Sequence, residues 1–136
     1  SNNDAKYSIA SIRFSKDNIY MTLKDLINKA NSLVPKISYQ EYAKKPKEYL
    51  LIDVREGMEI EETGSIPNSI NIPRGLIEMR GIPSNDNSDL DFNTPMIVYC
   101  GGGSRASLAG RTLKEIGFKH VYNLQGGYRG WKDCSA

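Results

Sequence analysis

The sequence predicts an α/β domain with a mainly parallel central sheet and helices on both of its faces. Three observations lead to this class. Short apolar runs that are rich in β-formers alternate with segments of helical periodicity. The run at residues 49–53 is almost continuously apolar, as is typical of a strand buried on both faces of a parallel sheet. A second such run, at residues 95–99, is followed by a glycine-rich turn and a helical pattern.

The composition indicates an ordinary globular protein of one domain. Of its 136 residues, 39% are hydrophobic and 25% are charged, and the chain is long enough to bury a core. The net charge of +2 is too small to argue for binding to nucleic acid or to a membrane surface. No apolar stretch approaches the ~18 residues that a membrane-spanning helix needs. We therefore expect neither a nucleic-acid partner nor a membrane partner.

The first 35 residues are expected to form an arm and one helix. Residues 1–18 are polar and without period, which is typical of a loosely packed terminus. Apolar residues then recur at helical spacing until Pro35 ends the pattern, at Leu23, Leu26, Ile27, Ala30 and Leu33. We expect residues 1–35 to be an N-terminal arm with an amphipathic helix that packs on a domain formed by residues 36–136. A helix that binds a partner is the alternative.

The domain is expected to open with a short strand and a short helix. Residues 36–37 are a candidate for a very short first strand. Ser38, with Glu41 three residues later, has the capping-box pattern that begins a helix, here one that runs to residue 44 or 45. The apolar run at residues 49–53 is then the next strand.

The middle of the chain contains a second candidate strand at residues 69–72, between two prolines. Pro73 suits the first turn of a helix through residue 79, because its missing N–H costs nothing there. Residues 84–93 are polar and rich in turn formers, and are expected to form a surface loop.

The C-terminal third is expected to contain a strand, a long helix, a strand and a last helix. The strand at residues 95–99 leads to a helix that begins at Ser104 and stops at Gly117. A strand follows at residues 120–122, with His120 as a structural residue. A short helix from residue 126 completes the alternation.

The turn at residues 100–105, with the sequence CGGGSR, has the features of a catalytic loop. Its glycines allow successive backbone N–H groups to point inward, and the N-terminus of a helix attracts anions. A thiol held there ionises more readily, and the thiolate is the nucleophilic form. Cys100 also follows a strand, and parallel sheets bind ligands beyond the carboxyl ends of their strands. A small buried cysteine beside an ordinary turn is the alternative.

Four motifs in a fixed order resemble those of the rhodanese (thiosulfate sulfurtransferase) family. They are LIDVRE at 51–56, GSIPNSINIP at 64–73, CGGGSRA at 100–106 and LQGGYRGW at 124–131, with Ser69 where alanine is commoner. The resemblance covers roughly residues 37–132 and implies a rhodanese-like α/β fold.

The resemblance implies a sulfurtransferase that needs no cofactor. The Cys100 thiolate would take the outer sulfur of a small-molecule donor such as thiosulfate, forming a persulfide. A thiophilic acceptor, cyanide or a thiol, would then remove that sulfur. The expected groups that bind the persulfide and its donor are the backbone N–H groups of the loop, at Gly101, Gly102, Gly103, Ser104 and Arg105. The Ser104 hydroxyl is expected to cap the helix, with donation to the sulfur as the alternative.

Charged residues near the loop are candidates for binding and support. Arg105 either faces the anion or braces the loop, and its planar fork suits either role. Asp53, at the end of a predicted strand, is the favoured carboxylate for bracing, with Arg55 and Glu56 as competing partners. Arg74 is a candidate to attract thiosulfate at the pocket mouth, with a solvated surface position as the alternative.

Two other functions compete with sulfur transfer to small molecules. Phosphatases of the rhodanese fold resemble this chain but have a Cys-x5-Arg loop that surrounds a tetrahedral phosphate. The Cys-x4-Arg spacing here forms a smaller ring, which favours a single extra sulfur atom. The second alternative is a sulfur carrier that delivers persulfide sulfur to a protein acceptor. It needs the same persulfide, so the motif does not separate it from an enzyme.

The two cysteines indicate free thiols rather than a disulfide framework. Cys134 is expected to be an incidental tail residue, with sulfur relay from Cys100 or an intermolecular bridge as alternatives. One histidine and no CxxC pair argue against a metal site. A free reactive thiol fits the cytoplasm, whereas a leader removed before Ser1 would allow a periplasmic location.

Overall fold

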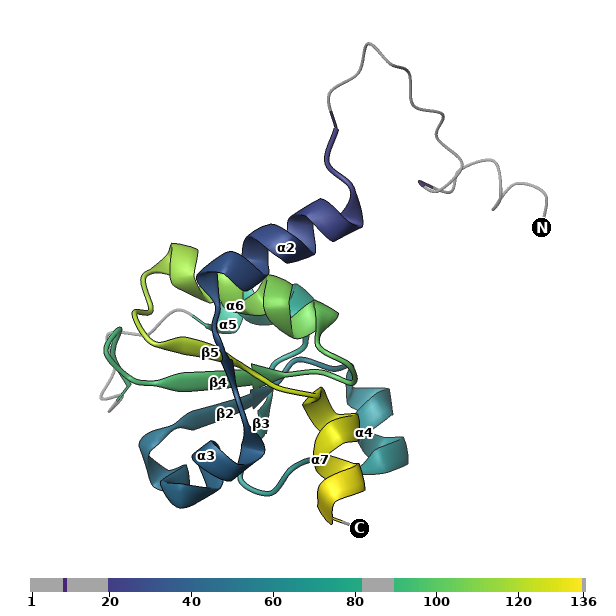
Figure 1. The fold of residues 1–136 in the computed structure, drawn as a ribbon, viewed down its shortest axis with the longest axis vertical. Helices are drawn as coiled ribbons and strands as arrows, with labels where there is room; N and C mark the ends of the chain where they lie inside the picture. The colour runs from purple at the N-terminus through teal and green to yellow at the C-terminus, as the bar shows by residue number, and fades with distance from the viewer. Residues whose placement is uncertain (1–8, 10–19, 82–89, 136) are drawn as a thin grey trace, which may run out of the picture.

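Five strands of the described chain form one parallel sheet with helices on both faces (Figure 1). The structure, a computed structural model, describes residue 9 and residues 20–81 and 90–135. The strand order is β1-β5-β4-β2-β3, and every neighbouring pair is parallel. The strands are β1 (Lys36–Ile37), β2 (Leu50–Asp53), β3 (Ile70–Asn71), β4 (Met96–Tyr99) and β5 (Val121–Leu124). The predicted fold class is confirmed.

The helices form two layers. Figure 1 shows α2, α5 and α6 on one side of the sheet and α3, α4 and α7 on the other. The described helices are α2 (Leu23–Leu33), α3 (Tyr39–Lys44), η2 (Pro46–Glu48), α4 (Gly57–Thr63), η3 (Arg74–Leu76), α5 (Ile77–Arg80), α6 (Ser104–Ile116) and α7 (Gly127–Ser135), where η marks a 3₁₀-helix. None of them is long and apolar enough to cross a membrane.

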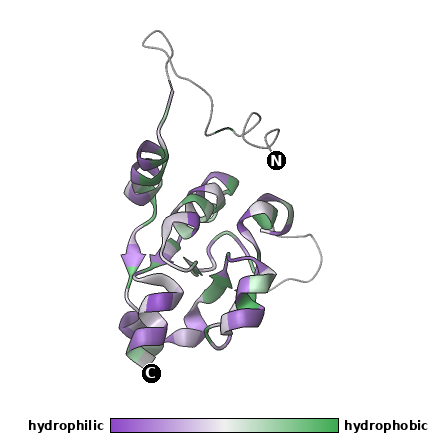
Figure 2. Cartoon of the chain, turned by 90° about the vertical axis from the view of Figure 1, so that its right-hand side faces the viewer, coloured by the Kyte–Doolittle hydropathy of each residue, from purple (hydrophilic) through white to green (hydrophobic). Residues whose placement is uncertain are grey.

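The central strand β4 divides the core in two. Met96 and Val98 belong to the apolar cluster that includes residues of α5 and α6, whereas Ile97 and Tyr99 belong to the cluster that includes residues of α3 and α7. All four side chains are buried, which explains the uninterrupted apolar run in the sequence. Figure 2 shows hydrophobic strands in the centre and helices whose outward faces are hydrophilic.

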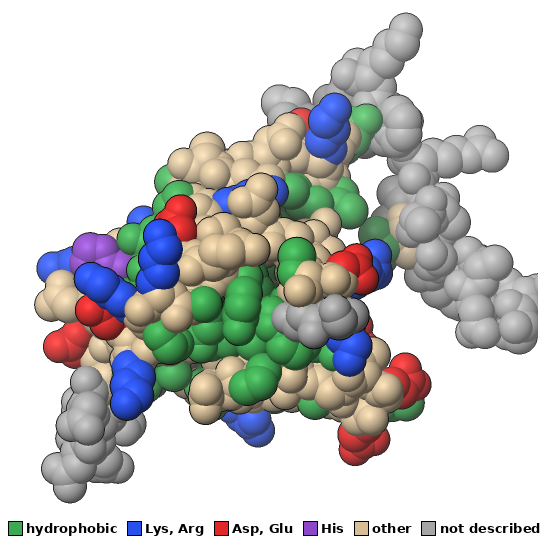
Figure 3. Space-filling model, turned by 60° about the horizontal axis from the view of Figure 1, so that its bottom comes forward, with side chains coloured by type: hydrophobic (Ala, Val, Ile, Leu, Met, Phe, Trp, Pro, Cys, Tyr) green, Lys and Arg blue, Asp and Glu red, His purple; other side chains and the backbone are tan. Residues whose placement is uncertain are grey.

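The second core continues toward the surface as half-buried aromatic side chains. Tyr39, Tyr49, Tyr122 and Trp131 pack against this core. Figure 3, which views the molecule from below, shows hydrophobic side chains gathered in the middle of this face.

The N-terminal helix α2 packs on α6. Thr22 caps it, because its hydroxyl accepts a hydrogen bond from the N–H of Asp25 and its own N–H donates to the Asp25 carboxylate. Ala30 and Val34 are fully buried. A Cβ at Gly110 of α6 would lie 2.9 Å from a methyl group of Val34, so only glycine allows this close approach.

The structure differs from the predicted elements at several places. Pro73 precedes η3, which leads into α5, so it flanks the helical segment instead of occupying its first turn. Helix α4 was not predicted, since its seven residues have little apolar periodicity. Cys134 lies in α7 rather than in a loose tail. The predicted arm at residues 1–18 and most of the predicted loop at 84–93 lie outside the described residues, and the division at residues 35 and 36 stays a prediction.

Candidate active site

The Cys100 thiol lies at the carboxyl end of the central strand β4, directly before the turn that leads into α6. The residue is 2% exposed, so the sulfur is enclosed by the fold. The N–H of Gly103 donates a hydrogen bond to Cys100 Sγ over 3.0 Å. Because an anionic sulfur is a better acceptor than a neutral thiol, this donor stabilises charge on the sulfur. Of the N–H groups expected to point at the sulfur, the structure brings that of Gly103 within hydrogen-bond distance.

Only one of the three loop glycines needs the backbone freedom of glycine. Gly103 has a φ of +126°, which residues with a Cβ rarely adopt. A Cβ at Gly101 would make ordinary contacts, 3.6 Å from Arg105 Nη2, and one at Gly102 would meet nothing within 4 Å. Gly103 is also the N-cap residue of α6, so the expected cap by Ser104 is wrong, and Ser104 is instead the first residue of the helix.

The first turn of α7 covers the back of the loop. The N–H of Tyr128 donates to the carbonyl of Cys100 over 2.8 Å, and that of Arg129 donates to the carbonyl of Gly101 over 3.3 Å. Gly127 has a φ of +60°, and a Cβ there would lie 2.6 Å from the Cys100 carbonyl oxygen. Gly127 of the LQGGYRGW motif therefore lets the first turn of α7 pack directly on the backbone of the Cys100 loop.

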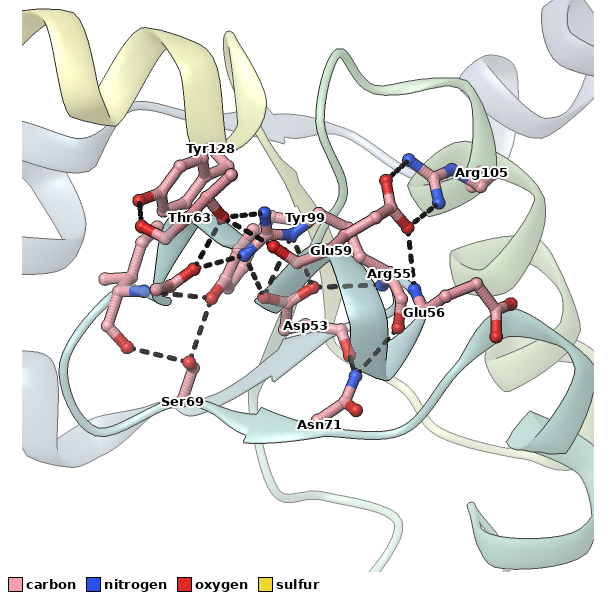
Figure 4. Close-up of polar contacts among 12 residues, drawn as sticks. Asp53, Arg55, Glu56, Glu59, Thr63, Ser69, Asn71, Tyr99, Arg105 and Tyr128 are labelled. Atoms are coloured by element: carbon pink, nitrogen blue, oxygen red, sulfur yellow. Dashed lines mark hydrogen bonds and ion pairs between the residues drawn. The ribbon is translucent and has the colours of Figure 1, made fainter. Parts of the chain in front are cut away.

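The loop arginine is held by a carboxylate that the sequence did not single out. Arg105 donates two parallel hydrogen bonds to Glu59 of α4, over 2.7 and 2.9 Å (Figure 4). These bonds lower the pKa of Glu59 to about 2, against the opposing effect of its partial burial, and raise the pKa of Arg105. The expected brace by Asp53 is wrong. The sequence signal that would have pointed to Glu59 is the capping-box spacing of Glu56 and Glu59 at the start of α4. The N–H of Glu56 donates to the Glu59 carboxylate over 2.8 Å.

Asp53 and Arg55 instead pair with each other in the interior. Arg55 donates from Nε and Nη2 to the Asp53 carboxylate over 2.8 to 3.2 Å, and both side chains are at most 3% exposed. The remaining donors of Arg55 reach the Thr63 hydroxyl and the Gly64 carbonyl, each over 2.8 Å. Its guanidinium also lies 4.1 Å from the ring centre of Tyr128. This pair therefore joins β2 to α4 and α7 (Figure 4).

The second motif, at residues 64–73, is attached to the end of the sheet by polar bonds. The Tyr99 hydroxyl accepts from the N–H of Ile66 over 3.1 Å and lies 2.9 Å from the Ser69 hydroxyl. Burial raises the pKa of Tyr99 to about 12. The amide of Asn71 donates to the carbonyls of Asp53 and Arg55, each over 2.9 Å.

A cavity of about 410 Å³ lies beside the loop, between α4 and α7. It is lined by Arg55, Glu59, Glu62, Thr63, Gly101, Tyr128, Arg129, Lys132 and Asp133. Arg129 approaches the loop closely, since a Cβ at Gly101 would lie 3.7 Å from its Nη2. Three basic residues line the cavity. Arg55 forms an ion pair with Asp53, whereas Arg129 and Lys132 form no ion pair with any described residue. These two cations of α7 are therefore available to an anion in the cavity.

Two residues considered for function lie elsewhere. Arg74 donates to Glu78 over 3.1 Å and to Thr112 of α6 over 3.0 Å, and it does not line the cavity beside the loop. Cys134 is exposed and faces a separate hollow beside Trp131. No group of three His, Cys, Asp or Glu side chains suited to a metal ion occurs in the described part of the chain.

The fold is therefore that of an α/β protein whose parallel sheet presents a cysteine at the carboxyl end of its central strand. Residues 38–134 match the family model described as "Rhodanese-like domain", and the chain belongs to this family. The resemblance that the four motifs indicated is confirmed.

The relatives that this chain matches include proteins named as sulfurtransferases and a putative sulfur carrier. The chain is 34% identical over 103 residues to the "Putative sulfur carrier protein YrkF" of Bacillus subtilis, covering 74% of this chain and 52% of that protein. It is 34% identical over 94 residues to the "Putative thiosulfate sulfurtransferase, mitochondrial" of Schizosaccharomyces pombe, covering 64% and 66%. It is 32% identical over 85 residues to a sulfurtransferase of Allochromatium vinosum, covering 62% and 73%. The chain thus spans about half the length of the first of these relatives.

Solved structures show the same fold. A polysulfide-sulfur transferase homodimer from Wolinella succinogenes matches with a TM-score of 0.66 and 31% identity, over 82% of each chain. A protein of unknown function from Rhodopseudomonas palustris, described as a "possible tyrosine phosphatase", matches with a TM-score of 0.75 and 27% identity, over 90% of this chain and 98% of that one. The named relatives of this rhodanese-like domain thus include sulfurtransferases and a putative sulfur carrier, whereas the Rhodopseudomonas neighbour is described by a different chemistry.

Proposed function

We propose that the chain is a sulfurtransferase in which Cys100 carries sulfane sulfur as a persulfide. The observation that carries this proposal is the bond from the Gly103 N–H to Cys100 Sγ, on a buried thiol at the carboxyl end of the central strand. A donor fixed at this position stabilises an anionic sulfur at the start of the reaction and after it. The names of the relatives point to the same chemistry.

The reaction consists of two displacements at sulfur. The Cys100 thiolate attacks the outer sulfur of thiosulfate, the S–S bond of the donor breaks, and sulfite leaves with the bonding electron pair. The product is the anionic persulfide of Cys100. Cyanide then attacks the outer persulfide sulfur, the new S–S bond breaks, and thiocyanate leaves while the thiolate is restored. Neither step requires a proton or an external oxidant.

The cavity beside the loop provides room and charge for an anionic donor. Its volume of about 410 Å³ is ample for thiosulfate, and Gly101 of the loop lines it. Arg129 and Lys132 offer positive charge at its edge, balanced in part by Glu62 and Asp133. The proposed donor is therefore a small anion that carries a sulfane sulfur.

Phosphatase chemistry is the second candidate, because the Rhodopseudomonas neighbour is described in those terms. Two features of this chain argue against it. The loop has four residues between Cys100 and Arg105, one fewer than the phosphatase pattern. Arg105 also uses both terminal nitrogens to bind Glu59, which leaves it poorly placed to surround a phosphoryl group.

Mass spectrometry of the intact protein tests the proposal. After incubation with thiosulfate and desalting, the chain should gain about 32 Da, the mass of one sulfur atom. Cyanide should discharge it as thiocyanate. Cys100→Ser should show neither result, whereas Cys134→Ser, the matched control, should show both. Thiocyanate formation by Cys100→Ser at the wild-type rate would overturn the assignment.

The same preparation separates the alternatives. Release of phosphate from an aryl phosphate at a rate comparable to sulfur transfer would establish the phosphatase instead. A persulfide that forms on Cys100 and is discharged negligibly by cyanide or small thiols would indicate a carrier that delivers sulfur to a protein acceptor.

A further inference from the structure

The N-terminal helix α2 contacts α6, the helix that follows the Cys100 loop, although α2 precedes the residues that match the family. The match begins at residue 38, whereas α2 ends at Leu33. Figure 1 shows α2 lying over α6, the helix that follows the loop. Asn31 of α2 lies 2.7 Å from the hydroxyl of Ser107, measured from its Oδ1 to Ser107 Oγ. This is a polar contact between segments 76 residues apart in the chain.

Ser107 connects this contact to the loop. The amide of Asn123 on β5 donates to Ser107 Oγ over 2.9 Å and to the carbonyl of Gly103 over 3.2 Å. Ser107 and Asn123 are each 2% exposed, so the bond between them is shielded from water. Gly103 in turn donates its N–H to Cys100 Sγ. A continuous hydrogen-bonded path therefore leads from α2 to the reactive sulfur.

The role of Asn31 follows from a count of the hydrogen-bond donors around the Gly103 carbonyl. The carbonyl of Gly103 already accepts two hydrogen bonds, from the Ser107 N–H over 2.9 Å and from Asn123. The Ser107 hydroxyl has one proton and two acceptors within reach, Asn31 Oδ1 and the Gly103 carbonyl at 3.0 Å. With Asn31 as the acceptor of the hydroxyl proton, the Gly103 carbonyl accepts from the Ser107 N–H and from Asn123 only. Without it, the hydroxyl proton turns to Gly103 and competes with Asn123.

We propose that Asn31 is a positioning residue for the Cys100 loop, and that α2 is therefore part of the active-site support. Gly103 has no side chain to hold its unusual backbone conformation, so these polar bonds fix its carbonyl and, through it, the direction of its N–H. The inference rests on the proposed role of Cys100 as the reactive thiol. It assigns a function to a helix that lies outside the family match.

The variant Asn31→Leu tests the inference, because leucine has a similar volume and no acceptor. The first measurement is the rate constant for alkylation of Cys100 by iodoacetamide across a range of pH, in a Cys134→Ser background. We expect it to fall about three- to tenfold at neutral pH, the effect of one lost hydrogen bond. Asn31→Asp should restore the rate, because a carboxylate accepts from Ser107. Asn28→Leu, an exposed asparagine on the same helix, is the matched control and should leave the rate unchanged.

A double-mutant cycle separates positioning from stability. Ser107→Ala breaks the same path, so combining it with Asn31→Leu should slow alkylation no further than either change alone. Additive effects, or a wild-type rate and pH profile in Asn31→Leu, would overturn the inference. So would equal losses of rate and thermal stability in Asn31→Leu and Asn28→Leu, because these would indicate that α2 acts only by packing.

The readout also separates this inference from the proposed function. Alkylation reports the reactivity of Cys100 and does not require sulfur transfer. If the wild-type protein forms no persulfide but its alkylation rate depends on Asn31 as described, the proposed function fails and the positioning role stands. If the persulfide forms equally well in Asn31→Leu and alkylation is unchanged, the positioning role fails and the proposed function stands.

Discussion

Arg105 and Glu59 form a two-point ion pair that attaches the catalytic loop to helix α4. The bonds are 2.7 and 2.9 Å long and join segments 46 residues apart. Arg105, the last residue of the loop, is therefore held from the side by a carboxylate.

The first prediction concerns the dependence of stability on pH. The pKa of Glu59 falls from 4.5 to about 2 on folding, so its ionised form stabilises the fold above pH 4.5 and loses this effect as the pH falls toward 2. Glu59→Gln should therefore be less stable than wild type at neutral pH, by about 1 kcal/mol or less, because the pair is more than a third exposed and solvent screens it. Urea unfolding at a series of pH values should show the two proteins converging below pH 4.5.

Glu62→Gln is the control for that experiment, since Glu62 lies on the same helix and forms no ion pair with a described residue. Its stability should follow that of wild type across the same range of pH. A difference between wild type and Glu59→Gln that persists at the acid end would show that the ion pair is not its cause.

The second prediction concerns the backbone of Gly103. Because its φ is +126°, Gly103→Ala should strain the loop and move the N–H away from Cys100 Sγ. We expect sulfur transfer to fall by about tenfold or more, as when a donor to a developing charge is removed. The measurement is the steady-state rate of thiocyanate formation. Gly75→Ala, where a Cβ meets nothing within 4 Å, should retain the wild-type rate.

The third prediction concerns the attachment of the segment at residues 64–73. Tyr99→Phe removes the acceptor of the Ile66 N–H and leaves that buried donor without a partner. We expect the free energy of unfolding to fall by about 1–3 kcal/mol, as urea denaturation would measure. Ser69→Ala removes the hydroxyl that neighbours Tyr99 and donates to the Ile66 carbonyl over 2.7 Å, but it leaves the Ile66 N–H with its acceptor, so it should cost less. Equal costs for the two variants would contradict this account.

The fourth prediction concerns recognition of the donor. Arg129 lies beside Gly101 and forms no ion pair within the described structure, so Arg129→Gln should raise the KM for thiosulfate and leave kcat nearly unchanged. The expected rise is about threefold to tenfold at low ionic strength, and it should shrink with added salt as the charge is screened. Arg80→Gln, an exposed arginine of α5, should not alter the KM. A KM for Arg129→Gln that equals the wild-type value at low salt would exclude this role.

The regular elements could be predicted because their signals are local. The apolar run before Cys100, the helical spacing from Ser104 to Gly117 and the capping residue Ser38 each act within a few positions of the chain. Helix α4 escaped prediction because it is short and half-exposed, with few apolar residues to form a period. Its stability comes from contacts with the loop and with α7, which are distant in sequence.

By itself, the sequence determined the fold class, the family and the place of Cys100 between a buried strand and a helix, because each depends on residue type and spacing along the chain. Only the tertiary structure decided the partners of the charged and polar groups. It paired Arg105 with Glu59, Asp53 with Arg55, and Asn31 with Ser107. The physical reason is that a hydrogen bond or ion pair requires a distance of about 3 Å, and spacing in the sequence does not specify which distant groups the packed elements bring that close.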